Sequence, residues 1–242
     1  MLDNYHIENI LFLDIETVPQ YPEHDHLPEN YSGLWKKKAS QLSRIEKFNT
    51  DDKANPDEIY DRAGIYAEFG KIVCISTGVM RNKTLWIKSF YSDDEKELLA
   101  GFTDMLSKLK QKNINYLCAH NGKEFDYPYL IRRMLINGID VPAILDLSGK
   151  KPWEVTHLDT MELWKFGDFK NYTSLELLAT VFNIPTPKDD IRGSDVARVY
   201  WKENDLLRIV AYCQKDVATI VNLFLRFKGI PLIGDDAIQI VS

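Results

Sequence analysis

Residues 9–17 read NILFLDIET, and this stretch decides the fold. Apart from its acids, it is apolar on both faces of an extended chain, which is typical of a central strand buried in a sheet. Asp14 and Glu16 stand two residues apart, so their side chains leave the same face of that strand. Two carboxylates in a buried strand repel each other and are costly to desolvate unless cations or protons compensate them. The stretch therefore predicts a central strand that carries a candidate cation site.

Strand and helix signals follow in an order that predicts one mixed sheet. β-Branched and aromatic runs predict further strands at 71–80, 83–91, 115–121 and 155–158. Helices are expected at about 34–47, from Asn55-Pro56, over 92–112 and 126–137, from Asp159 and Thr173, and over 204–227. Capping boxes are expected for Ser92 with Glu95, Asp159 with Glu162, and Thr173 with Glu176. The expected fold class is α/β: a mixed five-stranded sheet, three antiparallel strands and then parallel ones, flanked by helices. We expect 1–242 to form a single domain with a charged, partly helical insertion at about 20–70.

Composition limits the cellular setting but does not decide the partner. No stretch approaches the ~20 apolar residues that a membrane span requires, and the N-terminal MLDNYHIEN lacks a signal core. Cys74, Cys118 and Cys213 lie in apolar runs without a CxxC pair, which indicates buried, reduced thiols in a cytoplasmic protein. The net charge of −6 by itself disfavours a nucleic-acid partner. Bound metal ions would supply the missing positive charge.

Two further acidic motifs follow along the chain. Asp126 comes after Asn121-Gly122-Lys123-Glu124-Phe125, where a strand passes into a helix. Tyr212 and Asp216 lie in the long last helix, and their i, i+4 spacing places both side chains on one face. Each motif alone has an ordinary explanation: a solvated strand end for the D-x-E pair, a helix cap for Asp126, and a solvated face for Tyr212 and Asp216.

Taken together, the motifs resemble those of a known family. The order D-x-E, N-x3-F-D and Y-x3-D is similar to the three motifs of DEDD exonucleases in their tyrosine-bearing (DEDDy) form, which have a ribonuclease-H-like fold. The segments IYAEFGKIVCIS, AHNGKEFDYPYLIRRM, HLDTMELW and YCQKDVATI resemble predicted exonucleases related to the proofreading domain of family B DNA polymerases. The resemblance covers residues from about 9 to 228.

The resemblance implies a stand-alone 3′→5′ exonuclease acting on 3′ ends of single-stranded DNA or RNA, with DNA favoured. Two Mg²⁺ or Mn²⁺ ions per active site suit a group of carboxylates. By resemblance, Asp14 bridges both ions, Glu16 and Asp216 complete the first site, and Asp126 holds the second. Tyr212 orients the attacking water, and nucleoside 5′-monophosphates are released. Since the chain ends soon after the third motif, we expect no polymerase domain in the same chain.

Candidate substrate-binding residues lie in loops beside these motifs. Asn121 is expected either to contact substrate or to satisfy the backbone at the strand end. The lysines at 123, 150, 151 and 188 would contact phosphates, and Trp153 would stack on a base; the alternative is ordinary surface. The sequence does not distinguish a deoxyribonuclease from an exoribonuclease of the same fold.

Other interpretations have less support. An endonuclease of this fold places its last acid differently, and a non-catalytic nucleic-acid-binding module would have lost one of the four acids. His24-Asp25-His26 invites a metal site, but it lies in a loop between prolines without partner ligands at helical spacing. The basic run after Trp35 is interpreted as a solvated helix face.

Overall fold

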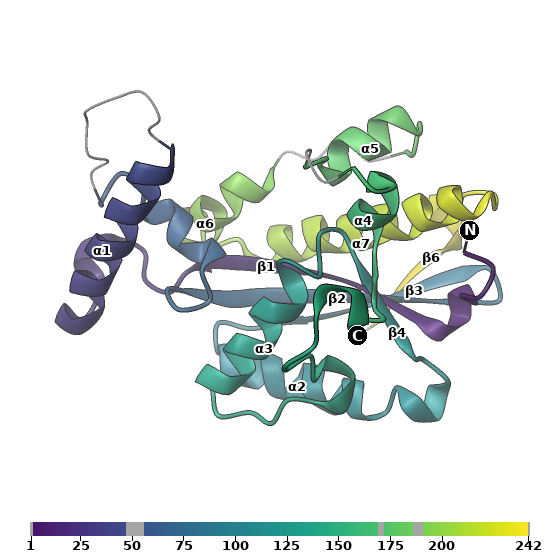
Figure 1. The fold of residues 1–242 in the computed structure, drawn as a ribbon, viewed down its shortest axis with the longest axis horizontal. Coiled ribbons are helices and arrows are strands. Elements are labelled where there is room, and N and C mark those ends of the chain that lie inside the picture. The colour runs from purple at the N-terminus through teal and green to yellow at the C-terminus, as the bar shows by residue number, and fades with distance from the viewer. Residues whose placement is uncertain (1, 47–55, 169–171, 186–190, 242) are drawn as a thin grey trace.

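The computed structural model describes residues 2–46, 56–168, 172–185 and 191–241, and a mixed sheet forms its centre (Figure 1). The sheet order is β5-β4-β1-β2-β3-β6. Its strands are β1 (Ile10–Pro19), β2 (Gly70–Arg81), β3 (Thr84–Tyr91), β4 (Tyr116–Ala119), β5 (Leu158–Asp159) and β6 (Ile238–Val241). Strands β1, β2 and β3 pair antiparallel, whereas β4 pairs parallel with β1, β5 with β4, and β6 with β3.

This topology confirms the predicted fold class and adds one strand to the five expected. The sequence pattern did not predict β6, because its four residues are half-buried or exposed and lack a continuous apolar run. It lies parallel to β3 at the edge of the sheet.

Helices cover both faces of the sheet. They are α1 (Glu29–Glu46), α2 (Glu95–Ser107), α3 (Asp126–Ile136), α4 (Thr160–Lys165), α5 (Leu175–Val181), α6 (Val196–Arg198) and α7 (Leu206–Lys228). Figure 1 shows α2 and α3 on one face, and α4, α5 and α7 on the other. Throughout the described ranges, no helix combines the length and apolar character that a membrane crossing needs.

The alternation along β1 assigns its two acids to the α7 face. Leu11, Leu13 and Ile15 pack into the cluster that contains α2 and α3 residues. Ile10 and Phe12 pack with α7 residues in a second cluster. Because side chains alternate along a strand, Asp14 and Glu16 continue the even-numbered series and face α7.

Three expected helix starts are wrong. Helix α1 begins at Glu29, five residues before the expected start. Asn55 lies outside the described residues, and Pro56 leads into turns and a 3-10 helix over Tyr60–Ile65 rather than an α-helix. Ser174, not Thr173, caps α5 by accepting a hydrogen bond from the Leu177 N–H.

The expected capping box at Ser92 and Glu95 is also wrong. Asp94 caps α2, because its carboxylate accepts hydrogen bonds from the Lys96 and Glu97 N–H groups. Glu95 is instead buried and forms an ion pair with Arg133 of α3, whose Nε lies 2.9 Å from Glu95 Oε1. This long-range pair outweighs the local capping preference of the sequence.

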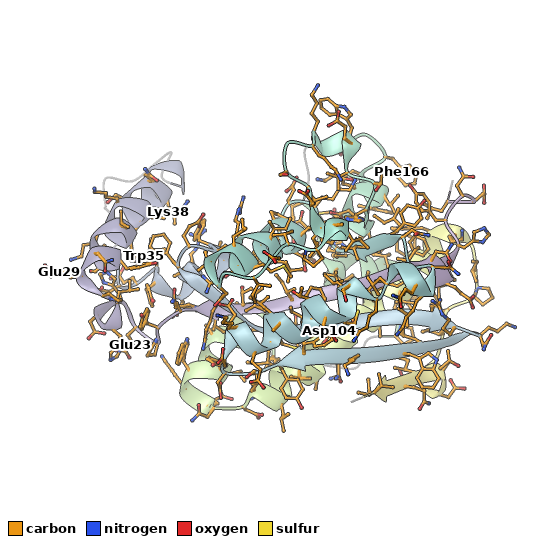
Figure 2. The ribbon with its side chains drawn as sticks, turned by 90° about the horizontal axis from the view of Figure 1, so that it is seen from below. Glu23, Glu29, Trp35, Lys38, Asp104 and Phe166 are labelled. Carbon is orange, nitrogen blue, oxygen red and sulfur yellow. The ribbon has the colours of Figure 1, made fainter. Side chains whose placement is uncertain are left out.

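The region at about 20–70 has a small apolar core of its own. Trp35 of α1 is fully buried against Tyr60 and Phe69, with ring centroids 5.5 and 5.2 Å away. Figure 2 shows Trp35 on the inner side of α1 and Glu29 on its outer side.

Candidate active site

Strand β1 presents Asp14 and Glu16 beyond the end of its neighbour β4. The pairing of β1 with β4 ends at Phe12 and Cys118, so in the described chain no strand continues along that edge. On the other edge, β1 stays paired with β2, and its register shifts after Glu16. Glu16 is 7% exposed and Asp14 is half-buried.

Helix α7 approaches these acids with one face. Tyr212 and Asp216 are hydrogen-bonded to each other through their side chains. Cys213, between them in sequence, donates from Sγ to the backbone oxygen and to Oδ2 of Asp14, both at 3.4 Å. Asp14, Glu16 and Cys213 each offer a ligand atom, and all three atoms lie within 4.8 Å of one another.

Asp126 reaches the same place from the start of α3. It is 3% exposed, and its carboxylate accepts hydrogen bonds from its own backbone and from that of Ile15, the residue between the two β1 acids. Phe125 is the N-cap of α3 and makes no side-chain cap. Asp126 is therefore not a solvated helix cap.

A tight turn after β4 sets the position of Asp126. Buried Asp159 accepts hydrogen bonds from the N–H groups of Asn121 at 3.0 Å and Lys123 at 3.1 Å. The same carboxylate caps α4 by accepting from the Met161 N–H at 2.9 Å, but the Glu162 side chain of the predicted capping box pairs with Lys123 instead. Asn121 adopts a left-handed backbone with φ 61°, which asparagine tolerates better than most residues.

The acids perturb one another electrostatically. Burial, followed by the charges of Asp216 and Asp126, raises the pKa of Asp14 well above its usual value. Burial and then Asp14 and Asp216 raise the pKa of Glu16. Burial raises the pKa of Asp126 to about 8, although its backbone hydrogen bonds oppose the rise. This crowding of like charges is relieved by bound cations or by protons.

The pKa of the Tyr212 hydroxyl is raised as well. Burial, then the charges of Asp216, Glu16 and Asp14, raise the pKa of its hydroxyl above the usual value of 10. The hydroxyl therefore stays protonated at neutral pH and acts as a hydrogen-bond donor.

A cavity of about 630 Å³ opens over this cluster, with Asp14, Tyr212 and Asp216 in its wall. This volume is within the roughly 300–1,000 Å³ typical of ligand pockets. The residues of its wall that were not predicted from the sequence include His120, Tyr172, Arg192 and Lys215. Two of them had a usable signal, since His120 directly precedes Asn121 and Lys215 lies three residues after Tyr212 on the same helix.

His120 fixes one wall of the cavity. Its Nδ1 lies 2.9 Å from Thr160 Oγ1 and its Nε2 lies 2.9 Å from the backbone oxygen of Thr173. Burial lowers the pKa of His120, so the ring is neutral at physiological pH.

The predicted substrate-binding residues are dispersed. Asn121 Oδ1 is buried and has no hydrogen-bond partner within the described ranges. Lys123 pairs with Glu162 of α4, with its Nζ 2.7 Å from Oε2. Trp153 is 77% exposed and, with Lys150 and Lys151, is not among the residues that line the cavity. Lys188 lies outside the described residues.

His24 has a structural role, whereas its exposed neighbours Glu23, Asp25 and His26 bring ligand atoms within 4.8 Å of one another. His24 is buried, with its Nδ1 in contact with Asp57 and its Nε2 3.2 Å from Ser32 Oγ.

Comparison with known proteins concerns the family and the fold of the chain. A model of the family described as "Predicted 3'-5' exonuclease related to the exonuclease domain of PolB" matches residues 65–231. The matched range includes Asp126, Tyr212 and Asp216 and begins after β1. The contribution of Asp14 and Glu16 therefore rests on the structure.

Similar proteins include two DNA polymerases. A DNA polymerase of Pyrococcus glycovorans is 23% identical over 146 residues, which are 55% of this chain and 18% of that protein. The structure of the family B DNA polymerase from the hyperthermophilic archaeon Pyrobaculum calidifontis shares the fold, with a TM-score of 0.52 and 16% identity. That match covers 89% of this chain and 24% of the polymerase, so the chain spans only about a quarter or less of either relative. Because the family model covers well over half of the sequence, the chain belongs to the family of predicted 3′-5′ exonucleases related to the exonuclease domain of PolB.

Proposed function

We propose that the chain hydrolyses phosphodiester bonds at the 3′ ends of single-stranded nucleic acid, with DNA as the favoured substrate, and releases nucleoside 5′-monophosphates. The observation that carries the proposal is the electrostatic proximity of Asp14, Glu16, Asp126 and Asp216, which come from β1, α3 and α7; Asp14 and Asp216 also line one cavity. Family membership supports the same reaction and direction.

The acids fit a pair of divalent cations. Mg²⁺ and Mn²⁺ prefer oxygen ligands, and a cluster whose members raise one another's pKa gains most from added positive charge. Asp14 would bridge the two ions, Glu16 and Asp216 would complete the first site, and Asp126 would hold the second. When bound, such ions activate water and neutralise the charge that develops on the phosphate and the leaving oxygen.

Tyr212 would orient the attacking water by hydrogen bonding. Its raised pKa keeps the proton on the hydroxyl, so the side chain does not serve as a base. Its hydrogen bond to Asp216 holds the ring in a fixed place next to the acids.

The decisive experiment incubates purified protein with Mg²⁺ or Mn²⁺ and with 3′- or 5′-labelled single strands of DNA and RNA. We expect stepwise shortening from the 3′ end that requires metal and disappears in Asp14→Ala. Asp140→Ala is the matched control, because Asp140 is an exposed acid that does not line the cavity. Equal activity in Asp14→Ala, or internal cuts only, would overturn the proposal.

The RNA arm tests the alternative within the same fold. Faster shortening of RNA than of DNA would assign an exoribonuclease. Retention of labelled strands without any shortening, with either metal, would indicate a binding module.

A further inference from the structure

A second, smaller cavity adjoins the candidate active site along α7. Its volume is about 210 Å³, below the roughly 300–1,000 Å³ of pockets for whole drug-sized ligands. Lys215 and Thr219 line both cavities, so the two are neighbours across these side chains.

The face of α7 explains this arrangement. At ~100° per residue, Tyr212, Lys215, Asp216, Thr219 and Asn222 fall within about 120° around the helix axis. Asn222 lies ten residues after Tyr212, about 15 Å further along the axis. One helix face therefore runs from the candidate catalytic tyrosine to the wall of the second cavity.

The charged side chains of this α7 face, Lys215 and Asp216, lie at the end that borders the larger cavity. Four carboxylates balance at most two divalent cations, which leaves no net positive charge for the other phosphates of a strand. Among the residues that line the larger cavity, Arg192 and Lys215 are basic, whereas Glu176 adds a further acid to Asp14 and Asp216. Of the two basic residues, Lys215 also borders the second cavity.

The second cavity has a largely apolar wall, which suits the face of a flat ring, and one acid, Asp235. Ala218, Ile233 and Ile238 contribute apolar surface. Asn222 is already engaged, since its Nδ2 donates to the Ile233 backbone oxygen at 3.3 Å and its Oδ1 accepts from the Ile233 N–H at 2.9 Å. The wall is thus held in place before any ligand arrives.

We propose that the second cavity binds a base of the nucleic-acid strand, and that Lys215 binds the phosphate between this base's nucleotide and those in the larger cavity. The inference rests on the proposed exonuclease function and extends it: substrate would be recognised beyond the nucleotides at the acids. Lys215 is then a substrate-binding residue for strands long enough to reach it.

The test compares substrates of increasing length. The p-nitrophenyl ester of thymidine 5′-monophosphate carries one nucleotide, and oligothymidylates of two to ten nucleotides extend it. In wild type we expect KM to fall with length until the second cavity is filled. We call the ratio of KM for the shortest substrate to KM for the longest the length advantage. In Lys215→Met this length advantage should shrink roughly tenfold or more, which corresponds to the loss of one charge-assisted hydrogen bond. Lys215→Arg should restore most of it.

Two further variants distinguish the contribution of the second cavity to the length advantage from that of the Lys215 charge. Ala218→Phe should fill the second cavity and shrink the length advantage with Lys215 still present. Lys96→Met removes a positive charge from the exposed surface of α2 and is the matched control, for which the wild-type length profile is expected. In an Asp14→Asn background, Lys215→Met should also reduce the salt dependence of single-strand binding by about 0.7 in log–log slope.

The outcomes distinguish the two proposals. A length advantage in Lys215→Met or Ala218→Phe equal to that of wild type overturns the inference, as does a flat profile in an active wild type; both leave the exonuclease proposal standing. Absence of hydrolysis of every substrate by wild type overturns both.

Discussion

Replacing Asp126 with asparagine is expected to raise the thermal stability of the metal-free protein at pH 8, although it removes a candidate metal ligand. The carboxyl is 3% exposed and its pKa rises to about 8 in the folded protein, from a usual value of 3.8. Between these values the unfolded chain is ionised while the folded protein still holds the proton. The stability of the folded state therefore falls as pH rises from about 4 to about 8, and asparagine removes this loss.

The magnitude follows from the pKa difference. Roughly four pKa units at about 1.4 kcal/mol each set a ceiling of about 6 kcal/mol. Relaxation of the site, which raises its effective dielectric constant, lowers this figure roughly twofold. Asparagine also weakens the hydrogen bond from the Ile15 backbone, at a cost of about 1 kcal/mol. The net gain is on the order of 2 kcal/mol, or roughly 4–8 °C in Tm for a chain of this length.

The assay is thermal denaturation in chelator at pH 5 and at pH 8, with Asp140→Asn as the exposed control. At pH 5 the variant and wild type should melt at nearly the same temperature, because little more than one of the roughly four pKa units of loss has then accumulated, and the weaker hydrogen bond of asparagine offsets it. Saturating Mn²⁺ at pH 8 should reverse the order, since a ligand at 100 times its Kd stabilises by about 2.7 kcal/mol and the variant binds it less well. A lower Tm for Asp126→Asn in chelator at pH 8 would refute the raised pKa of the buried Asp126 carboxyl.

Three other predictions concern the site and its support. Tyr212→Phe should lower kcat roughly 10²-fold while Mn²⁺ affinity, measured by calorimetry, changes little; a matching loss of metal affinity would contradict its assigned role. Below pH 8 the apparent Mn²⁺ Kd should rise up to about tenfold per pH unit, because raised pKa values keep the ligands protonated; a pH-independent Kd would oppose this. Glu95→Ala should cost about 3–5 kcal/mol in urea unfolding, because Arg133 is left buried without its carboxylate, and a cost under 1 kcal/mol would argue against the pair.

Local sequence patterns were enough to predict the strand and helices that carry the candidate metal-binding acids. The apolar run around Asp14 and Glu16 fixed a central strand and placed both acids on one face. The i, i+4 spacing likewise fixed the shared face of Tyr212 and Asp216. Asp126 was located at a strand-to-helix turn, which is where the structure has it.

Most features that the sequence did not predict depend on contacts between segments that are distant along the chain. Glu95 has the sequence signature of a cap but pairs with Arg133, 38 residues away, and the stronger buried interaction decides its position. The cavity wall formed by Tyr172 and Arg192 depends on how the segments around α5 and α6 fold back over α7, which no local pattern encodes. Strand β6 is too short and too exposed to carry an apolar signal.

The most direct measurement of the central claim is anomalous diffraction from crystals of the protein soaked in Mn²⁺ at pH 8. Two manganese peaks, ~3.5–4 Å apart and in contact with Asp14, Glu16, Asp126 and Asp216, are expected, and both should weaken in Asp14→Ala. Well-ordered crystals without a peak at these carboxylates, or with peaks only elsewhere on the surface, would contradict the account.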